Sequence, residues 1–248
     1  MARLIEHLVE PQRLLLFWQA RESQKRSRYR VGQLVKQGGH VVLQYSVGTE
    51  IACAKEVGFQ GYPAFPLKQV EHRHQVMEAF TRRLPPRTRR DFSRYLELRA
   101  IPADADISEF ALLGYSGAKL PDDGFELVHP FDEPPAAFEV LIEVAGFRHE
   151  AELEVSELQA GDEVQFVPEP NNPVDSSAIR MESKGCKLGY VPRGHLTMLN
   201  RMLSGGADLT GEVFRSNGTP ARPLVYVLTQ IIHHNGLMMP SSPLRLQA

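Results

Sequence analysis

The hydrophobic and polar positions of this 248-residue chain follow two different periods, which predict strands in some segments and helices in others. Short apolar runs bounded by turn-forming residues predict strands at 14–18, 29–34, 40–45, 125–128, 164–167 and 224–232. The strands at 29–34 and 40–45 flank Gly38-Gly39, a pair that is typical of a hairpin turn. Helical periodicity predicts helices at 70–84, 87–98 and 193–203, and a short helix after Ser108. The pattern as a whole predicts an α+β fold.

A proline-rich, acidic segment at 129–135 interrupts both periods and predicts a break between domains. We expect a mixed α/β N-terminal domain at 1–130, a linker at 131–136, a small β-rich domain at 137–234 and a C-terminal tail at 235–248. No apolar run approaches the roughly 18 residues of a membrane span, and the first residues lack a signal-peptide core. Cys53 and Cys186 lie on opposite sides of the linker and are expected to be reduced. These features predict a cytoplasmic protein without a membrane partner.

The most specific motif begins at Glu169 and ends at Arg193. Residues 169–175, Glu-Pro-Asn-Asn-Pro-Val-Asp, predict a rigid polar turn, because Asn and Asp side chains bond to nearby backbone and Pro173 fixes one φ angle. An Ala-Ile pair at 178–179 predicts the next strand, and Gly-Tyr-Val-Pro-Arg at 189–193 predicts a strand end followed by a helix start. Such a turn beside a helix start can hold an anion, although the same residues can also serve only the fold.

The spacing of the turn, the Ala-Ile pair and the Gly-Tyr-Val-Pro-Arg segment resembles the HIRAN domain over about residues 137–234. This domain occurs in fork-remodelling ATPases and in stand-alone bacterial proteins. The resemblance implies a small OB-like β-barrel with one helix. It also implies a nucleic-acid partner, with capture of single-stranded DNA or of an exposed 3′ end.

The resemblance further implies roles for individual residues. Asp175 would accept a hydrogen bond from a terminal hydroxyl, Asn172 would shape the turn and contact the end nucleotide, and Arg148 and Arg193 would contact phosphate. Tyr190 stands where the end-binding members of the family have a histidine. The positions where those members stack bases on aromatic rings are occupied here by His149, Val174 and Pro220.

The charges are distributed unequally between the two halves. Residues 1–135 carry 19 Lys and Arg and 17 Asp and Glu, whereas residues 136–248 carry 9 and 13, a net charge of −4. Phosphate neutralisation supplies most of the non-specific affinity for duplex DNA, and the C-terminal half has too few cations for this mode of binding. If this half binds nucleic acid, we expect it to hold one or two nucleotides in a small pocket. Two basic stretches, 21–30 and 82–99, either form solvated surfaces or supply a phosphate-binding face.

Catalytic chemistry is not indicated by any motif of the chain. The sequence has no Walker loop, His-Glu-x-x-His, Cys-x-x-Cys or Gly-x-Ser-x-Gly, so we expect a non-enzymatic protein without metal or cofactor. The pair His72 and His74, on the helix predicted at 70–84, and the pair His233 and His234 would each point to different faces and are expected to be surface residues.

The N-terminal half resembles the N-terminal subdomain of HipA-type toxin kinases. The resemblance rests on Val31-Gly32-Gln33-Leu34, Tyr45, Pro66-Leu67 and Leu113-Gly114 followed by Gly117-Ala118. It keeps an alternative function open, in which the chain is a protein-interaction or scaffold module that does not bind nucleic acid. Such a module would be toxin–antitoxin-like or an accessory factor of DNA repair.

Overall fold

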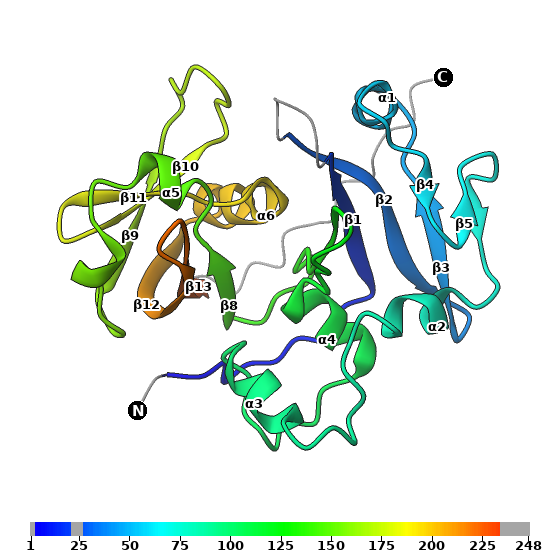
Figure 1. Cartoon of the computed structure of the whole chain (residues 1–248), viewed down its shortest axis with the longest axis horizontal. Helices are drawn as coiled ribbons and strands as arrows, with labels where there is room; N and C mark the ends of the chain where they lie inside the picture. Colours follow the sequence, from blue (N-terminus) through cyan, green and yellow to red (C-terminus); the bar gives the residue numbers. More distant parts are fainter. Residues whose placement is uncertain (1–2, 21–26, 234–248) are drawn as a thin grey trace.

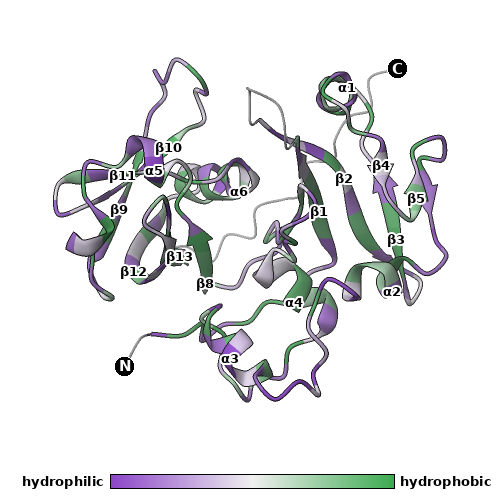
Figure 2. Ribbon diagram, in the orientation of Figure 1, coloured by the Kyte–Doolittle hydropathy of each residue, from purple (hydrophilic) through white to green (hydrophobic). Residues whose placement is uncertain are grey.

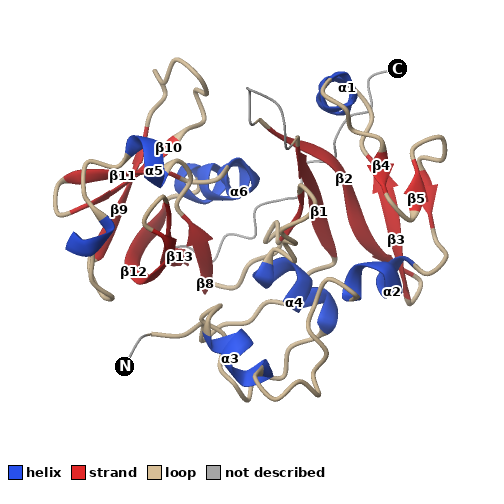
Figure 3. Ribbon diagram, viewed as in Figure 1, coloured by secondary structure: helices blue, strands red, loops and turns tan. Residues whose placement is uncertain are grey.

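The computed structural model describes residues 3–20 and 27–233, whose strands form one large antiparallel sheet in each half of the chain (Figures 1 and 3). The N-terminal sheet has the strand order β6-β3-β2-β1-β7. Its members are β1 (Arg13–Gln19), β2 (Arg28–Gln37), β3 (His40–Tyr45), β6 (Glu71–His72) and β7 (Phe125–Val128). Strands β4 (Gly61–Tyr62) and β5 (Phe65–Pro66) form a separate pair. The predicted α+β class is confirmed.

Alternation along β1 decides which side chains lie on each face of the N-terminal sheet. Leu14 and Leu16 are fully buried in a hydrophobic cluster on one face. Leu15 and Phe17 point to the other face, where they pack with Val128 of β7. Because successive side chains of a strand alternate, Arg13 lies on the same face as Leu15 and Phe17.

Local signals identify several elements correctly. Strands β2 and β3 form the predicted hairpin, and Gly38 and Gly39 at its tip have φ angles of +56° and +82°. Ser108 is the N-cap of α4 (Glu109–Ser116), where its Oγ accepts a hydrogen bond from the Ala111 amide at 3.0 Å.

The helices predicted at 70–84 and 87–98 are shorter than expected. They are α2 (Val76–Thr81) and α3 (Phe92–Glu97). The helix prediction is wrong at its start, because Glu71–His72 forms β6 and pairs with β3. His72 is therefore a buried strand residue, whose Nε2 lies 3.1 Å from the Pro66 carbonyl oxygen, and not a surface residue of a helix. Helix α1 (Thr49–Glu56) has too weak an apolar stripe to be predicted.

The C-terminal sheet has the strand order β11-β10-β9-β12-β13-β8. Its strands are β8 (Ala137–Glu143), β9 (Glu163–Pro168), β10 (Ile179–Ser183), β11 (Cys186–Tyr190), β12 (Ala207–Thr219) and β13 (Arg222–His233). The short helix α5 (Phe147–Glu150) and the 3₁₀ helix η1 (Val155–Glu157) follow β8, and α6 (Arg193–Ser204) follows β11. Helix α6 is the helix predicted at 193–203.

The barrel predicted for the C-terminal half is not confirmed, because the six-stranded sheet is open. The two edges of the sheet approach each other at a bridge between Ala145, which follows β8, and Tyr190 of β11, with reciprocal backbone hydrogen bonds of 2.8 and 2.9 Å. Gly189 allows the chain to approach at this point: it has a φ of +143°, and a Cβ there would lie 2.5 Å from the Ala145 oxygen.

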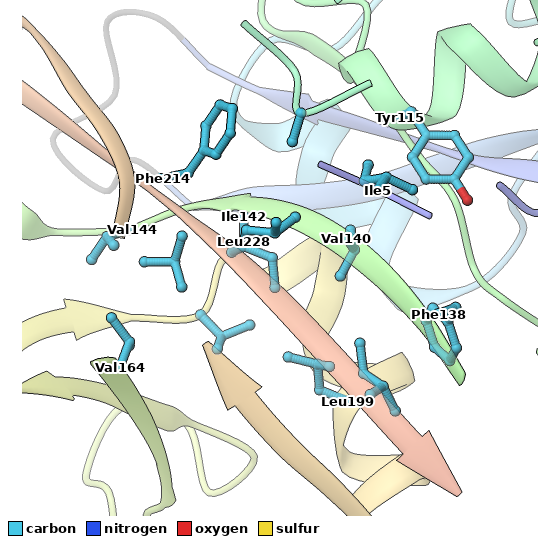
Figure 4. Packing of buried hydrophobic residues seen from close by; sticks show 14 of the residues in the cluster. Ile5, Tyr115, Phe138, Val140, Ile142, Val144, Val164, Leu199, Phe214 and Leu228 are labelled. Carbon is cyan, nitrogen blue, oxygen red and sulfur yellow. The ribbon is translucent and has the colours of Figure 1, made fainter. Parts of the chain in front are cut away.

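One hydrophobic core cluster contains residues from both halves of the chain. It includes Ile5, Leu112, Phe131, Phe138 and Leu199, and Figure 4 shows part of its packing. Phe131 is fully buried and stacks on Phe138 at 4.4 Å between ring centroids. The segment predicted as a linker is thus anchored in the core at this residue, while the division into domains stays a prediction.

Hydropathy follows the same layout, since hydrophobic residues gather along β1, β3 and β8 and most loops are hydrophilic (Figure 2). Among the residues that the structure describes, no helix has the length and apolar character needed to cross a bilayer.

Candidate nucleic-acid interface

The turn between β9 and β10 is held by short-range hydrogen bonds. Asn172 Oδ1 accepts the amides of Val174 and Asp175 at 2.9 and 3.1 Å. Asp175 Oδ1 in turn accepts the Ser177 amide at 2.9 Å. These bonds are the local closures that Asn and Asp make in turns, and they fix the backbone as the sequence predicts. They also leave Val174 at the tip, with 94% of its surface exposed.

A polar cluster supports one side of this turn. The Tyr190 hydroxyl donates to Glu169 Oε2 at 3.1 Å and accepts from Lys187 Nζ at 3.1 Å and from Asn172 Nδ2 at 3.3 Å. Asn172 Nδ2 also donates to Glu169 Oε2 at 2.8 Å, and this bond is the main reason that the pKa of Glu169 lies below its usual value. Asn172 and Tyr190 are therefore occupied by contacts within the protein.

The other side of the turn opens into a groove of about 520 Å³ between the N-terminal sheet and α6. Asp175, Ser177 and the first turns of α6 form one wall, to which α6 contributes Arg193 and Gly194. The side chain of Asn200 ties α6 to the turn, because its Nδ2 donates to the Ser177 carbonyl at 2.9 Å.

The second wall of the groove comes from the N-terminal half. Along β1, the face that carries Leu15 and Phe17 also presents Arg13 to the groove, and Arg30 of β2 and Glu50 of α1 complete this wall. The contribution of this wall could not be predicted from local patterns, because it depends on how the N-terminal sheet packs against α6. Arg30 belongs to the basic stretch 21–30, of which residues 21–26 lie outside the described residues.

The structure brings together only part of the predicted site. Asp175 and Arg193 line the same groove, whereas Arg148 and His149 are exposed on α5 and are not among the residues that line it. Arg148 and Arg193, both expected to contact phosphate, therefore do not lie together in the groove that contains Asp175. Pro220 is exposed in the turn between β12 and β13 and also lies outside the groove.

The arginines of the groove differ in how firmly they are bound. Arg13 forms a bidentate pair with Asp132 at 2.7 and 2.8 Å, and these hydrogen bonds raise the pKa of Arg13 and lower that of Asp132. Arg201 donates to the carbonyl oxygens of Pro130 and Phe131. Arg193, by contrast, is half exposed, and its nearest carboxylate oxygen, on Glu50, is 3.8 Å away. Arg193 is thus available to an anionic ligand.

Comparisons with known proteins bear on the C-terminal sheet. Residues 138–222 match the family described as HIRAN domain. A solved structure of a protein from Lactobacillus plantarum is 22% identical, covers 40% of this chain and 98% of its own, and has a TM-score of 0.35. The HIRAN domain of human HLTF is 20% identical, covers 39% of this chain and 77% of its own, and has a TM-score of 0.31. The search of curated proteins found no match.

The family match begins within β8 and extends to the start of β13. It contains the polar turn, the Ala-Ile pair and the start of α6, and it lies outside the N-terminal sheet. The resemblance of residues 1–130 to the HipA-type subdomain stays a prediction. Residues 138–222 form a HIRAN domain, the family that the turn, the Ala-Ile pair and the Gly-Tyr-Val-Pro-Arg segment indicate.

Proposed function

We propose that this chain is a non-catalytic nucleic-acid-binding protein whose HIRAN domain captures single-stranded DNA or an exposed 3′ end. HIRAN domains are in general nucleic-acid-binding modules, and the family match supports such a role. The observation that carries the proposal is the shared groove of Asp175 and Arg193.

The chemistry of the two side chains suits the end of a strand. One oxygen of the Asp175 carboxylate accepts the Ser177 amide, which leaves the second oxygen to accept a hydrogen bond from a 3′ hydroxyl. Arg193 can donate to the neighbouring phosphate, since a guanidinium matches phosphate geometry. The C-terminal half has a net charge of −4, which disfavours contact with many phosphates. A small pocket that engages few phosphates is compatible with this charge.

The remaining predicted site residues, which are Arg148, His149, Asn172 and Tyr190, have two different roles. Asn172 and Tyr190 hold the turn in shape, whereas Arg148 and His149 on α5 would contact the strand beyond the groove. His149, Val174 and Pro220 stand at the positions where the end-binding members of the family stack bases on aromatic rings. A stacked aromatic ring contributes about 1–3 kcal/mol per base to binding. Affinity is therefore expected to be lower than that of a domain with all three rings.

A protein partner is the alternative function. The observations that favour it are the net charge of −4 of residues 136–248 and the absence of Phe, Tyr and Trp rings at 149, 174 and 220. In that case the HIRAN domain would serve as an interaction module or scaffold.

Fluorescence anisotropy at low salt separates these functions. The protein should bind a short single strand with a 3′ hydroxyl about tenfold more tightly than the same strand with a 3′ phosphate, because a charge-assisted hydrogen bond contributes about 1.5–3 kcal/mol. Asp175→Asn keeps an acceptor for Ser177 but removes the negative charge, and should reduce this preference. Arg193→Ala should weaken binding of both strands. Equal binding of both ends would refute end recognition, and no binding at micromolar protein would favour the protein-interaction module.

A further inference from the structure

A β-bulge in the N-terminal sheet places Arg30 on the face that borders the HIRAN domain. Leu16 lies opposite Gly32 and Phe17 lies opposite Arg30, so that Val31 is an extra residue in β2. Val31 is fully buried on the opposite face of the sheet. Without the bulge, the alternation of the strand would direct Arg30 toward that hydrophobic face. The bulge instead directs it into the groove beside Phe17.

The Arg30 guanidinium has few partners in this position. Its Nε is buried without a hydrogen-bond acceptor, and its Nη2 reaches only Gln33 Oε1, at 3.4 Å. Within residues 3–20 and 27–233, no carboxylate forms a salt bridge with this guanidinium. Burial, with a smaller effect of nearby Arg13, lowers the pKa of Arg30. A partly buried cation with an unused donor is unfavourable unless an acceptor, such as a water molecule or an anion, completes its contacts.

Glu50 connects Arg30 to the HIRAN side of the groove. Its Oε1 accepts the backbone amide of Arg30 at 2.8 Å and lies 3.8 Å from Arg193 Nη2. A single carboxylate oxygen is thus near both the β2 backbone at Arg30 and the side chain of Arg193. An anion that enters the groove would meet the two arginines together with this one competing carboxylate.

We propose that the nucleic-acid strand lies in the groove between the two halves, with a backbone phosphate bound by Arg30 and Arg193. The N-terminal sheet is then the second wall of the binding site, and Glu50 weakens binding by competing for the arginines. This inference rests on the function proposed for the HIRAN domain and adds a contribution from the other half of the chain.

The size and lining of the groove agree with one nucleotide. Its volume of about 520 Å³ lies in the roughly 300–1,000 Å³ range of small-molecule sites. Leu15 and Phe17 from β1 and Leu196 and Met198 from α6 provide an apolar surface for a sugar or base next to the arginines. A groove that pairs apolar surface with phosphate donors is typical of single-strand binding.

Three substitutions in the full chain test the N-terminal contribution, with a fluorescent oligothymidine that ends in a 3′ hydroxyl as the probe. Arg30→Gln should weaken binding about tenfold and reduce the slope of log K against log salt by about 0.7, the value for one phosphate contact on a single strand. Arg30→Lys should retain most of the slope, because the positive charge remains. Glu50→Gln keeps an acceptor for the Arg30 amide and should strengthen binding about fivefold, since one repulsive charge is removed.

Arg90→Gln is the matched control. Arg90 is exposed in the second basic stretch, and its substitution changes the net charge of the protein by the same amount as Arg30→Gln. It should alter affinity less than twofold. Thermal unfolding of each variant shows whether a loss of binding comes from a loss of structure.

The outcomes distinguish this inference from the proposed function. If Arg193→Ala weakens binding while Arg30→Gln and Glu50→Gln leave it unchanged, the HIRAN domain binds the strand alone and the N-terminal wall takes no part. If Arg90→Gln has the same effect as Arg30→Gln, the contribution is a general effect of charge, and the inference is overturned. If the wild-type protein does not bind the oligonucleotide, both the proposed function and the inference are wrong.

Discussion

At the scale of single residues, Tyr190 is expected to support the turn more than to contact a ligand. Tyr190→Phe removes a hydroxyl that makes three hydrogen bonds, to Glu169, Lys187 and Asn172. We expect the free energy of unfolding, measured in urea, to fall by about 1 kcal/mol. Oligonucleotide affinity should fall less than in Arg193→Ala. Unchanged stability with a loss of affinity as large as that of Arg193→Ala would instead identify Tyr190 as a ligand contact.

His129 gives the stability of the protein a predictable dependence on pH. Its Nδ1 accepts the Phe131 amide at 2.9 Å and its Nε2 lies 3.1 Å from the Val9 carbonyl oxygen, so the folded ring is neutral with hydrogen on Nε2. Burial lowers the pKa of His129 to about 4. A histidine in the unfolded chain titrates near pH 6.5, so between about pH 6.5 and pH 4 the unfolded state binds the additional proton. The free energy of unfolding should therefore fall as the pH decreases through this window.

The comparison of wild type with His129→Gln measures this effect. Between pH 7 and pH 5 the wild-type protein should lose about 2 kcal/mol more stability in urea unfolding than the variant, since only the histidine can take up the proton. Above pH 6.5 the contribution of the neutral ring is fully retained. Identical pH dependence in the two proteins would show that His129 can be protonated in the folded state.

Sequence reasoning at this scale succeeded where bonds are local. Asn172 and Asp175 bond to amides two or three residues away, so the turn could be predicted from residue types alone. Arg193 could be placed because Pro192 precedes α6. The position of Arg30 depends on a bulge in β2 opposite β1, which no local pattern encodes. The position of Arg148 depends on how α5 is oriented, which no local pattern encodes either.

At the scale of elements, local caps and turns correctly predicted the β2–β3 hairpin and the helices α4 and α6. The missed or misassigned elements are those that depend on distant partners. Strand β6 exists because β3 has a free edge to pair with, and β12 lies between β9 and β13 in the sheet. A helical pattern at 70–84 could not reveal the first of these pairings.

Gly189 tests how the two edges of the HIRAN sheet meet. Gly189→Ala would place a Cβ 2.5 Å from the Ala145 oxygen and 2.8 Å from Val144 Cγ1, at a φ of +143° that disfavours other residues. We expect a loss of about 3 kcal/mol and, for a chain of this size, an unfolding temperature lower by roughly 10 °C. Gly205→Ala is the control, because its Cβ would meet atoms no closer than 3.4 Å. Equal effects of the two substitutions would mean that this close approach does not matter.

At the scale of the whole molecule, the shared core predicts that both halves unfold together. The core cluster contains Ile5 and Leu112 from the N-terminal half and Phe138 and Leu199 from the HIRAN half. Helix α6 also approaches β7 closely, since a Cβ on Gly194 would lie 2.8 Å from Val128 Cγ2.

The single tryptophan, Trp18 on β1, makes cooperative unfolding easy to test. Its fluorescence reports on the N-terminal sheet, whereas far-UV circular dichroism reports on both halves. We expect the two thermal transitions to coincide. Separate midpoints would show that the N-terminal sheet and the HIRAN domain are independent folding units, as the sequence alone suggests at 129–135.

The central claim, that nucleic acid binds in the groove between the HIRAN turn and the N-terminal sheet, is tested most directly by hydrogen exchange with mass spectrometry. Addition of a single strand with a 3′ hydroxyl should slow amide exchange at 172–178, at the start of α6 and in β2 near Arg30. Peptides that cover α2 should exchange as before, because that helix lies outside the groove. Protection confined to α2, or no protection at saturating oligonucleotide, would contradict the account.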